Sequence, residues 1–543
     1  MPAAHGNAAR TRLLAAGDIG STGAYHVGDE SMMLGLIEGV AASGVDVQWT
    51  LMSAQPERSS ERFGVGAVPK LTFADCAGPE DRERRLEEFD SILAEPPARW
   101  PLVAPPRWRE ALSAIAASDA VVIAGGGNLS RSWPEHVFER VALVRAARRA
   151  ARPVAITGQT IGPSFDVRTR PLVAEILAGC AFVGVREEHS YRLALELGAQ
   201  PEHTALQFDD AIGFQDSEPP RSAEIVGDEP FIAVTLNQLG DTSDPAGVVP
   251  KLAAQLSVLG RCTGAAVVLV PHVGDLDGDR VHDVRMACAV IAAAGDSPAL
   301  RLAPLPSPQD AAWYCRHAQL VVSTRYHPIV FAMATATPAL FLYQDHYTLV
   351  KGHGALALAG LQGWIVSAGQ AALGLLVPAA LELWTRRGAV REHLQSLAPA
   401  IEKSRRQHVA ALLAALLPAR PRVFVEAIVH RCGPLPEGDW VERAHDGLAV
   451  LDAHLAVLHA HLAATNTSME REAMVRQLTL LERRATTAEQ WAGVLAKEIE
   501  RKEADLVIAH SALAELAKRR EGGLLQDSGA ETNTGTEAPG RSR

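Results

Sequence analysis

The chain has 543 residues with a formal net charge of −11, and 48% of its residues are hydrophobic and 21% charged. This length suggests roughly two to four domains, and the composition is that of a globular protein, which excludes wholesale disorder. The negative charge argues against a nucleic-acid binder that relies on a general basic surface.

The six cysteines show no C-x-x-C pair and no regular spacing. Reduced thiols fit this usage better than a disulfide framework or a zinc site, so we expect no metal and a cytoplasmic location. The opening residues, "MPAAHGNAARTRLLAAGDIG", contain no apolar stretch long enough for a signal peptide. No long uncharged apolar stretch follows, so any membrane contact is expected to be peripheral.

Short apolar runs alternate with amphipathic segments from residue 12 to residue 214. The runs "RLLAAG", "VDVQWTLMS", "DAVVIAGGG", "RPVAITGQTIGP" and "AFVGVR" indicate buried strands, and "DESMMLGLIEGVAASG" and "HVFERVALVRAARRAA" indicate helices. This alternation predicts a doubly wound, mostly parallel sheet.

A polar, Pro-containing linker is predicted at 215–230, and the alternation then restarts with "FIAVTLN", "GAAVVLVPH", "QLVVSTRYH" and "PALFLY". The fold class is therefore α/β, with two Rossmann-like halves and a helical C-terminal extension. In such sheets, ligands bind beyond the carboxyl ends of the strands. The predicted segments are a flexible N-terminus (1–11), a first half (12–214), the linker (215–230), a second half (231–365), a helical crossover (366–430), an extension (437–520) and a disordered tail (521–543).

In the extension, Ile499, Leu506 and Leu513 recur at seven-residue steps, although Lys502 interrupts the companion row. Two interpretations stay open. The helices form a short coiled coil that makes a homo-oligomer, or one amphipathic helix packs on its own chain.

Three glycine-rich loops follow predicted strands. "GDIGSTGAYHVGDES" (17–31) contains Gly28, Asp29 and Glu30; "VVIAGGGNLS" (121–130) contains Gly126, Gly127 and Asn128; "TGQTIGP" (157–163) is the third. Glycines let a ligand approach the backbone closely, but each loop alone is equally compatible with a structural turn. None has the spacing of a dinucleotide fingerprint or a Walker loop.

Two stretches carry cations where strands end. In "GVREEHSYRLALELG", Arg186 follows an apolar run, and its alternative is a surface arginine paired with Glu187 or Glu188. In "STRYHPIVFA", Arg325, Tyr326 and His327 precede a helix predicted to begin at Pro328. An open helix N-terminus beside cations favours an anion such as a phosphate or carboxylate.

As an ordered set, these stretches resemble the polysaccharide pyruvyl transferase family over roughly residues 12 to 365. The matching run is G-D-I-G…Y-H-V-G-D-E-S, D-A-V-V-I-A-G-G-G, P-V-A-I-T-G-Q-T-I-G-P, V-R-E-E-H-S, D-D-A-I, S-T-R-Y-H-P-I-V-F-A and L-Y…Lys351-G. The resemblance implies a GT-B-like fold and transfer of a pyruvyl group from phosphoenolpyruvate to two hydroxyls of a sugar.

Carried over from the family pattern, His327 is the expected acid/base. Arg325, Arg186, Tyr326 and Lys351 are the expected donor ligands, and the loops with Gly28, Asp29, Glu30, Gly126, Gly127 and Asn128 face the acceptor or the cleft. The sequence departs from the family at His26, where many members have Asn, and at Tyr326, where Leu is usual.

The resulting hypothesis is a pyruvyl transferase that needs no cofactor beyond phosphoenolpyruvate as donor substrate and acts on a glycan or glycolipid precursor. A histidine can give and take protons near neutral pH, which suits the several proton transfers of ketal formation. Two rival hypotheses are a GT-B glycosyltransferase that uses a sugar nucleotide and a non-catalytic assembly protein that acts through its C-terminal helices.

Overall fold

A computed structural model describes residues 10–21, 25–213, 220–237, 245–276, 282–295 and 299–417, all within one compact unit, Met1–Gly438. The predicted coiled coil at 437–520, the oligomer built on it and the disordered tail lie outside the described residues. Within those residues, no helix has both the length and the apolar composition needed to cross a bilayer.

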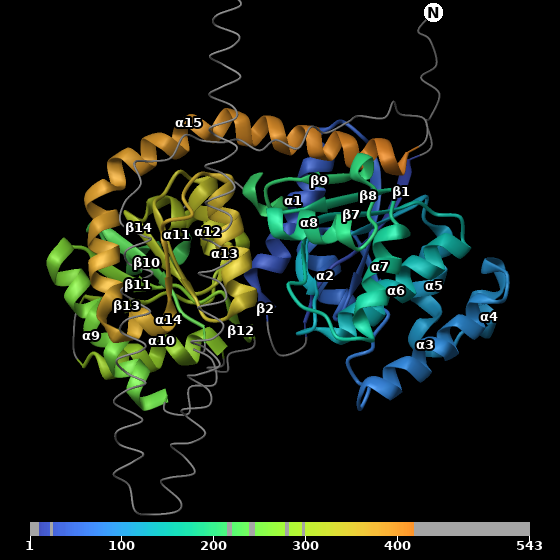
Figure 1. Cartoon of the computed structure of the whole chain (residues 1–543), viewed down its shortest axis with the longest axis horizontal. Coiled ribbons are helices and arrows are strands. Elements are labelled where there is room, and N and C mark those ends of the chain that lie inside the picture. Colours follow the sequence, from blue (N-terminus) through green and yellow to red (C-terminus); the bar gives the residue numbers. More distant parts are fainter. Residues whose placement is uncertain are drawn as a thin grey trace, which may run out of the picture. The chain divides into compact units, whose positions relative to one another are not determined.

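The first half is built on an eight-stranded parallel sheet in the order β4-β3-β1-β5-β7-β8-β9, with β6 also paired to β7. Helices pack around the sheet (Figure 1). The strands are β1 (Thr11–Ala16), β3 (Val47–Ser53), β4 (Gly66–Pro69), β5 (Ala120–Ile123), β6 (Gly126–Leu129), β7 (Val154–Ile161), β8 (Phe182–Val185) and β9 (Thr204–Leu206). The helices are α1 (Val27–Ala42), α2 (Pro56–Phe63), α3 (Pro79–Leu93), α4 (Trp100–Val103), α5 (Pro106–Ala117), α6 (Pro134–Arg149), α7 (Thr169–Ala178) and α8 (Glu188–Glu196), with short helices η1 (Pro97–Arg99), η2 (Pro201–His203) and η3 (Asp210–Gly213).

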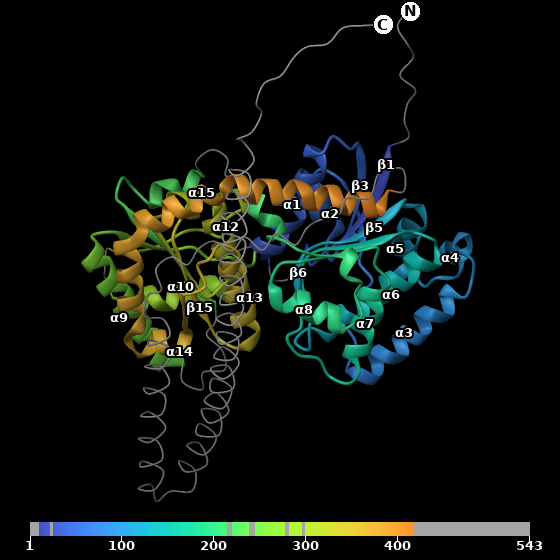
Figure 2. The ribbon, with the colours of Figure 1, turned by 45° about the horizontal axis from the view of Figure 1, so that its top comes forward.

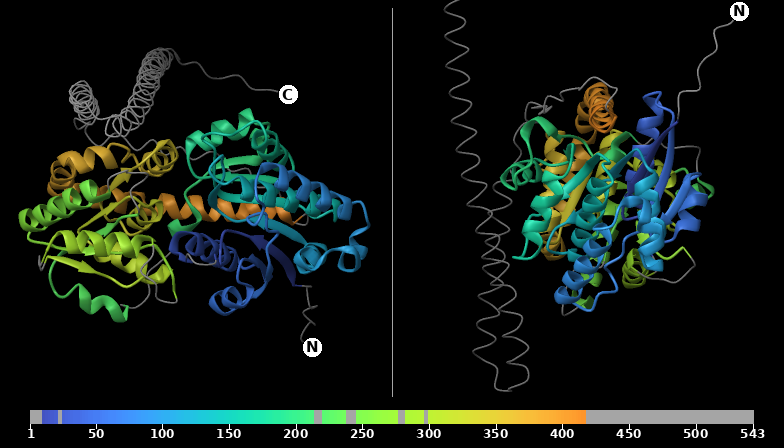
Figure 3. Two further views of the ribbon diagram at one scale, coloured as in Figure 1. Left: turned by 90° about the horizontal axis from the view of Figure 1, so that it is seen from below. Right: turned by 90° about the vertical axis from the view of Figure 1, so that its right-hand side faces the viewer.

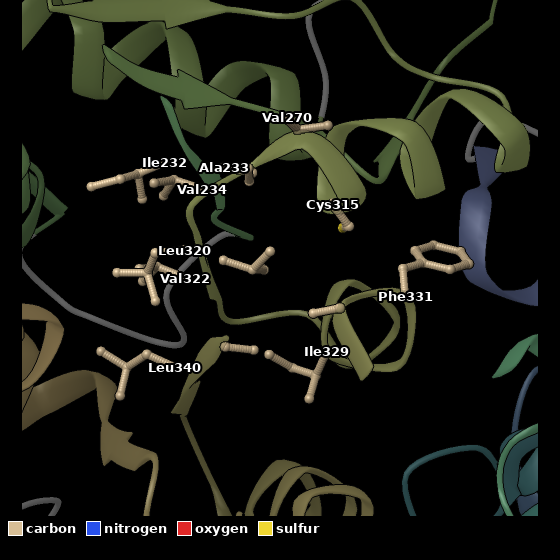
Figure 4. Packing of buried hydrophobic residues seen from close by; sticks show 14 of the residues in the cluster. Ile232, Ala233, Val234, Val270, Cys315, Leu320, Val322, Ile329, Phe331 and Leu340 are labelled. Atoms are coloured by element: carbon tan, nitrogen blue, oxygen red, sulfur yellow. The ribbon is translucent and has the colours of Figure 1, made fainter. Parts of the chain in front are cut away.

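The second half contains a six-stranded parallel sheet in the order β13-β11-β10-β14-β15-β16. Its core joins the central strands to the helix that follows β14 (Figure 4). The strands are β10 (Phe231–Thr235), β11 (Ala266–Leu269), β13 (Leu300–Leu302), β14 (Leu320–Ser323), β15 (Ala339–Tyr343) and β16 (Ile365–Ser367). The helices are α9 (Pro245–Thr263), α10 (His282–Ala293), α11 (Pro308–His317), α12 (Tyr326–Ala334), α13 (His346–Leu358) and α14 (Ala368–Gln370), with short helices η4 (Arg221–Ile225) and η5 (Ala371–Leu375).

The predicted fold class, two Rossmann-like α/β halves followed by helix, is confirmed. The central strands are buried and rich in Val, Ile, Leu and Ala, the pattern of a parallel sheet covered on both faces, although β7 also contains the polar residues Thr157, Gln159 and Thr160. Two expectations were wrong. The run at Gly126 is a short strand, β6, and not a loop, and α12 begins at Tyr326, two residues before Pro328.

Two features tie the halves together. The two-residue strands β2 (Tyr25–His26) and β12 (Val273–Gly274), one from each half, pair antiparallel. Helix α15 (Leu376–Leu416) packs against α9 and β14 of the second half and against β7 and β8 of the first, and Figures 2 and 3 show it passing over both. Its early apolar residues join the core of the second half, and its late ones join the core of the first.

Candidate functional site

Arg186 lies at the carboxyl end of β8 and is completely buried, so the alternative of a surface arginine is wrong. Its Nη1 is 2.6 Å from Asp209 Oδ2, and its Nε donates to Thr160 Oγ1 at 2.9 Å. Its Nη2 has no hydrogen-bond partner among the described residues. A buried guanidinium with one unpaired N–H group is well suited to bind an anion.

Tyr326 and Lys351 meet Arg186 across the boundary between the halves. The Tyr326 ring lies between two cations, with its centroid 4.3 Å from Arg186 Cζ and 5.2 Å from Lys351 Nζ. Such cation–π contacts hold both side chains in place. Burial, and then the charge of Arg186, lower the pKa of Lys351 to about 7.

Tyr347, on the same helix as Lys351, connects this cluster to the first half. Its hydroxyl donates to the Gly127 carbonyl at 2.8 Å and lies 3.4 Å from Lys351 Nζ. A Cβ atom at Gly127 would overlap the Tyr347 hydroxyl, so this contact requires glycine. The glycine run therefore serves close packing between the halves.

His327 occupies the first turn of α12 and packs on α1. A Cβ atom at Gly28 would overlap the imidazole ring, so only glycine permits this approach. His327 Nε2 is 3.9 Å from Asp209 Oδ2 and has no hydrogen-bond partner among the described residues. Burial, followed by the charges of Arg186 and Lys351, holds the pKa of His327 well below its usual range, so the ring is neutral at pH 7.

Arg325 and Glu30 point to other partners. Arg325 forms a forked pair with Asp283 of α10, with Nη2–Oδ1 at 2.6 Å and Nε–Oδ2 at 3.1 Å. The charge of Arg325 is therefore already matched by a carboxylate. The sequence predicted Arg325 as a ligand of the donor substrate and did not foresee this pairing. Glu30 Oε1 accepts from Gly20 N at 3.0 Å and pairs with Arg62 at 2.9 Å.

The remaining loop residues line the edges of the cluster. Asp29 Oδ2 is 3.4 Å from His26 Nδ1, in the first turn of α1. The carbonyl of Gly126 accepts from Gln159 Nε2 at 2.9 Å, and the Asn128 side chain lies against Gly126. The structure thus brings together Arg186, Tyr326, His327 and Lys351 with Gly28 and Gly127, and gives the other predicted residues separate partners.

Sequence reasoning missed Asp209 and placed Glu187 at the surface, although both are buried in the cluster. Asp209 binds Arg186, and Glu187 accepts from Thr160 Oγ1 at 3.1 Å; both carboxylates are buried. Burial raises the pKa of Glu187 to about 7. The consecutive acids at the end of β9 were the available signal for Asp209, because acids rarely follow a buried strand without a partner.

Asp210, next to Asp209, carries a prediction. Burial, and then the charge of Asp209, raises its pKa to about 7 from an ordinary value of 3.8, although Thr157 donates to it at 2.7 Å. The folded state therefore keeps a proton that the unfolded chain has lost. Stability from this group is full below about pH 4 and is lost as the pH rises through 7.

We therefore expect Asp210→Asn to reduce the fall in unfolding free energy between pH 5 and pH 8 by on the order of 2 kcal/mol. Urea unfolding at both pH values measures it, with Asp46→Asn, an exposed aspartate, as the control. An equal fall in wild type and Asp210→Asn would contradict the assignment.

The chemistry available to the cluster is that of an anion site with proton-transfer groups. Two cations, an imidazole whose Nε2 has no hydrogen-bond partner among the described residues, and groups with pKa values near 7 lie within one region. Among the described residues, no three His, Cys, Asp or Glu side chains are placed to hold a metal ion.

Residues 26–346 match the model of the polysaccharide pyruvyl transferase family. No curated protein sequence matches the chain. Among solved structures, the chain is similar to a putative UDP-N-acetylglucosamine 2-epimerase from Listeria monocytogenes, with a TM-score of 0.52 and 13% identity over 77% of this chain and 100% of that one. It is also similar to S. aureus MnaA in its structure with UDP, with a TM-score of 0.51 and 11% identity over 76% and 100%. At these identities the likeness shows the fold, a GT-B-like pair of Rossmann-like domains.

Proposed function

Because the chain belongs to the polysaccharide pyruvyl transferase family, we propose that it transfers a pyruvyl group, as a ketal, from phosphoenolpyruvate to a sugar of a glycan or glycolipid precursor. One observation supports the donor most directly. Arg186, which is buried, and Lys351, which is partly buried, both lie over one aromatic ring, beside an imidazole whose Nε2 is unpaired among the described residues. Phosphoenolpyruvate carries a phosphate and a carboxylate, which need two separate cationic groups.

The reaction needs proton transfer at defined places. The first sugar hydroxyl adds to C2 of the enol while C3 gains a proton, and the C2–O bond to phosphate breaks as the second hydroxyl closes the ketal. The proton of the first hydroxyl is thereby balanced by the one added at C3, and that of the second leaves with phosphate. A histidine between the two substrates can carry these protons.

The neutral state of His327 fits this role. Burial, and then the charges of Arg186 and Lys351, lower its pKa in the ligand-free protein. A bound anion offsets both charges, so donor binding raises the pKa of the imidazole toward neutrality. Asp209, 3.9 Å from Nε2, is placed to stabilise the imidazolium that follows. Donor binding thus favours the protonated form of His327 by offsetting the two charges, while the effect of burial remains.

Donor identity is tested by calorimetric titration of the full chain with phosphoenolpyruvate and, separately, with UDP and UDP-N-acetylglucosamine. We expect heat from phosphoenolpyruvate alone. Binding of the uridine ligands without phosphoenolpyruvate would reject the proposal in favour of a glycosyltransferase that uses a sugar nucleotide. Phosphate release on incubation with acceptor glycans, followed by phosphorus NMR, tests turnover.

Donor affinity is expected to fall as the pH rises above 7. Lys351 loses its positive charge and Glu187 gains a negative one through the same range, so both changes oppose an anion. If only the charged lysine binds, the dissociation constant rises about tenfold per pH unit above 7.

Lys351→Arg provides the comparison, since a guanidinium stays protonated throughout. The affinity of this variant for phosphoenolpyruvate should depend less on pH than that of wild type. The ionisation of phosphoenolpyruvate itself affects both proteins equally and so drops out of the comparison. Titrations at pH 6, 7, 8 and 9 measure this. Identical slopes would show that Lys351 is not the titrating group.

A further inference from the structure

A cavity of about 240 Å³ lies between the two halves and outside the cluster around His327. The first half contributes side chains from β2, α1 and α2. The second half contributes Leu276 and the segment between β13 and α11. The lining residues are Tyr25, Glu30, Leu34, Arg62, Phe63, Leu276, Leu305, Pro306, Ser307, Pro308 and Gln309.

One wall of the cavity is polar and is formed by Tyr25, Glu30 and Arg62. The Arg62 guanidinium lies 4.5 Å from the Tyr25 ring centroid, and its Nη1 is 2.9 Å from Glu30 Oε1. Glu30 is only 2% exposed, and its Oε2 has no hydrogen-bond partner among the described residues. A buried carboxylate oxygen left unpaired is costly, so a ligand that donates a hydrogen bond to it would be favoured.

The charges in the wall select against an anion. Glu30 matches the charge of Arg62, and Asp310 adds a negative charge in the first turn of α11. The Ser307 side chain already caps that helix by accepting from Asp310 N at 3.1 Å. The N–H groups of Asp310 and Ala311 are thus already bonded to Ser307. Pro308 has no N–H group, so the start of α11 offers little to a phosphate.

The other walls are apolar, formed by leucine, proline and phenylalanine side chains. A sugar ring fits both the polar wall and the apolar walls. Its C–H faces pack on apolar groups, and its hydroxyls can donate to a carboxylate and accept from a guanidinium. The cavity volume is at the small end of ligand pockets and suits a single ring.

The position of the cavity relates it to the cluster. Successive residues of a strand point to opposite faces, so Tyr25 of β2 lines the cavity while His26 faces Asp29 and the cluster. Gly28, on which His327 packs, lies between Tyr25 and Glu30 in the chain. The two sites are neighbours, divided by the β2–β12 pair.

We propose that this cavity binds one uncharged sugar residue, through Glu30 and Arg62. That the sugar belongs to the acceptor rests on the proposed function; saccharide binding itself does not. Because both halves line the cavity, a bound sugar would also favour the arrangement in which they are together.

The test is saturation-transfer NMR of the full chain with the methyl glycosides of glucose, galactose and mannose and with N-acetylglucosamine. At least one should give signals with wild type. Leu305→Trp, which fills the cavity, should abolish them. Glu30→Gln keeps an oxygen for Gly20 and Arg62 but replaces the unpaired acceptor with a donor, and should weaken binding about tenfold.

Glu38→Gln, the same chemical change at an exposed position of α1, is the matched control and should bind as wild type does. Titration of each folded variant with phosphoenolpyruvate measures the donor site separately. The affinity for phosphoenolpyruvate should be unchanged in Leu305→Trp. Absence of signal from every saccharide, or full signal in Leu305→Trp, overturns the cavity proposal while leaving the donor proposal standing. Saccharide signals that vanish in Leu305→Trp support it even if phosphoenolpyruvate does not bind.

Discussion

His327→Ala is expected to bind phosphoenolpyruvate about as well as wild type and to turn over about 10²- to 10⁴-fold more slowly, the usual worth of a general acid/base. The reason is that the donor's charge is met by Arg186 and Lys351, whereas the imidazole is neutral before binding. Calorimetric affinity and a single-turnover rate on the same preparation separate the two effects.

Tyr326→Phe is the paired control, since it keeps the ring between the two cations and removes only the hydroxyl. We expect it to lose far less turnover than His327→Ala. A purely structural role for His327 predicts a different pattern, in which melting temperature and donor affinity fall together because the contact with Gly28 is lost. Normal turnover in His327→Ala would end the catalytic assignment.

Arg186→Ala is expected to reduce the free energy of unfolding by about 3–5 kcal/mol, in addition to losing donor binding. The substitution leaves Asp209 buried with its partner at 2.6 Å removed, and it also removes the cation 3.9 Å from the buried Glu187. Urea unfolding at pH 7 measures the loss.

Arg186→Lys separates stability from binding. It keeps a positive charge beside Asp209 but loses the rigid fork that also reaches Thr160, so it should fold better than Arg186→Ala and still bind the donor weakly. Arg192→Ala, in an exposed pair with Glu188, should cost no more than about 1 kcal/mol. If Arg186→Ala were as stable as wild type, the pairing of Arg186 with Asp209 would not contribute to the free energy of unfolding.

The fold was readable from the sequence because its central strands are short, continuous runs of β-branched and aliphatic residues. The strands that were missed, such as β4 at Gly66–Pro69 and β16 at Ile365–Ser367, are short, lie at sheet edges and have no fully buried side chains. Their pairing depends on neighbours far along the chain, which periodicity does not report. The start of α12 was misplaced because Pro328 also fits the third helical position, where its missing N–H costs nothing.

Only part of the site could be predicted from the sequence, because its pairings also join residues that are far apart in the chain. Arg186 follows a strand and Tyr326 and His327 begin a helix, where composition signals a ligand. Lys351 lies within α13 and was expected only from the family pattern. The partner of Arg325, Asp283, begins a helix 42 residues earlier, and Tyr347 reaches Gly127 across 220 residues. Which carboxylate neutralises which cation is set by how the two halves meet.

Helix α15 has a consequence for how the chain is made. Val409, Leu412 and Leu416 complete one face of the first sheet, packing with residues as early as Leu13. During synthesis, the first half is finished near Leu206, roughly 200 residues before that covering segment emerges. At about 5–20 residues per second, this delay is on the order of 10–40 s. For that time the part of this apolar sheet face that α1 does not cover stays exposed on the nascent chain, so folding in the cell depends on whatever shields it until the helix arrives.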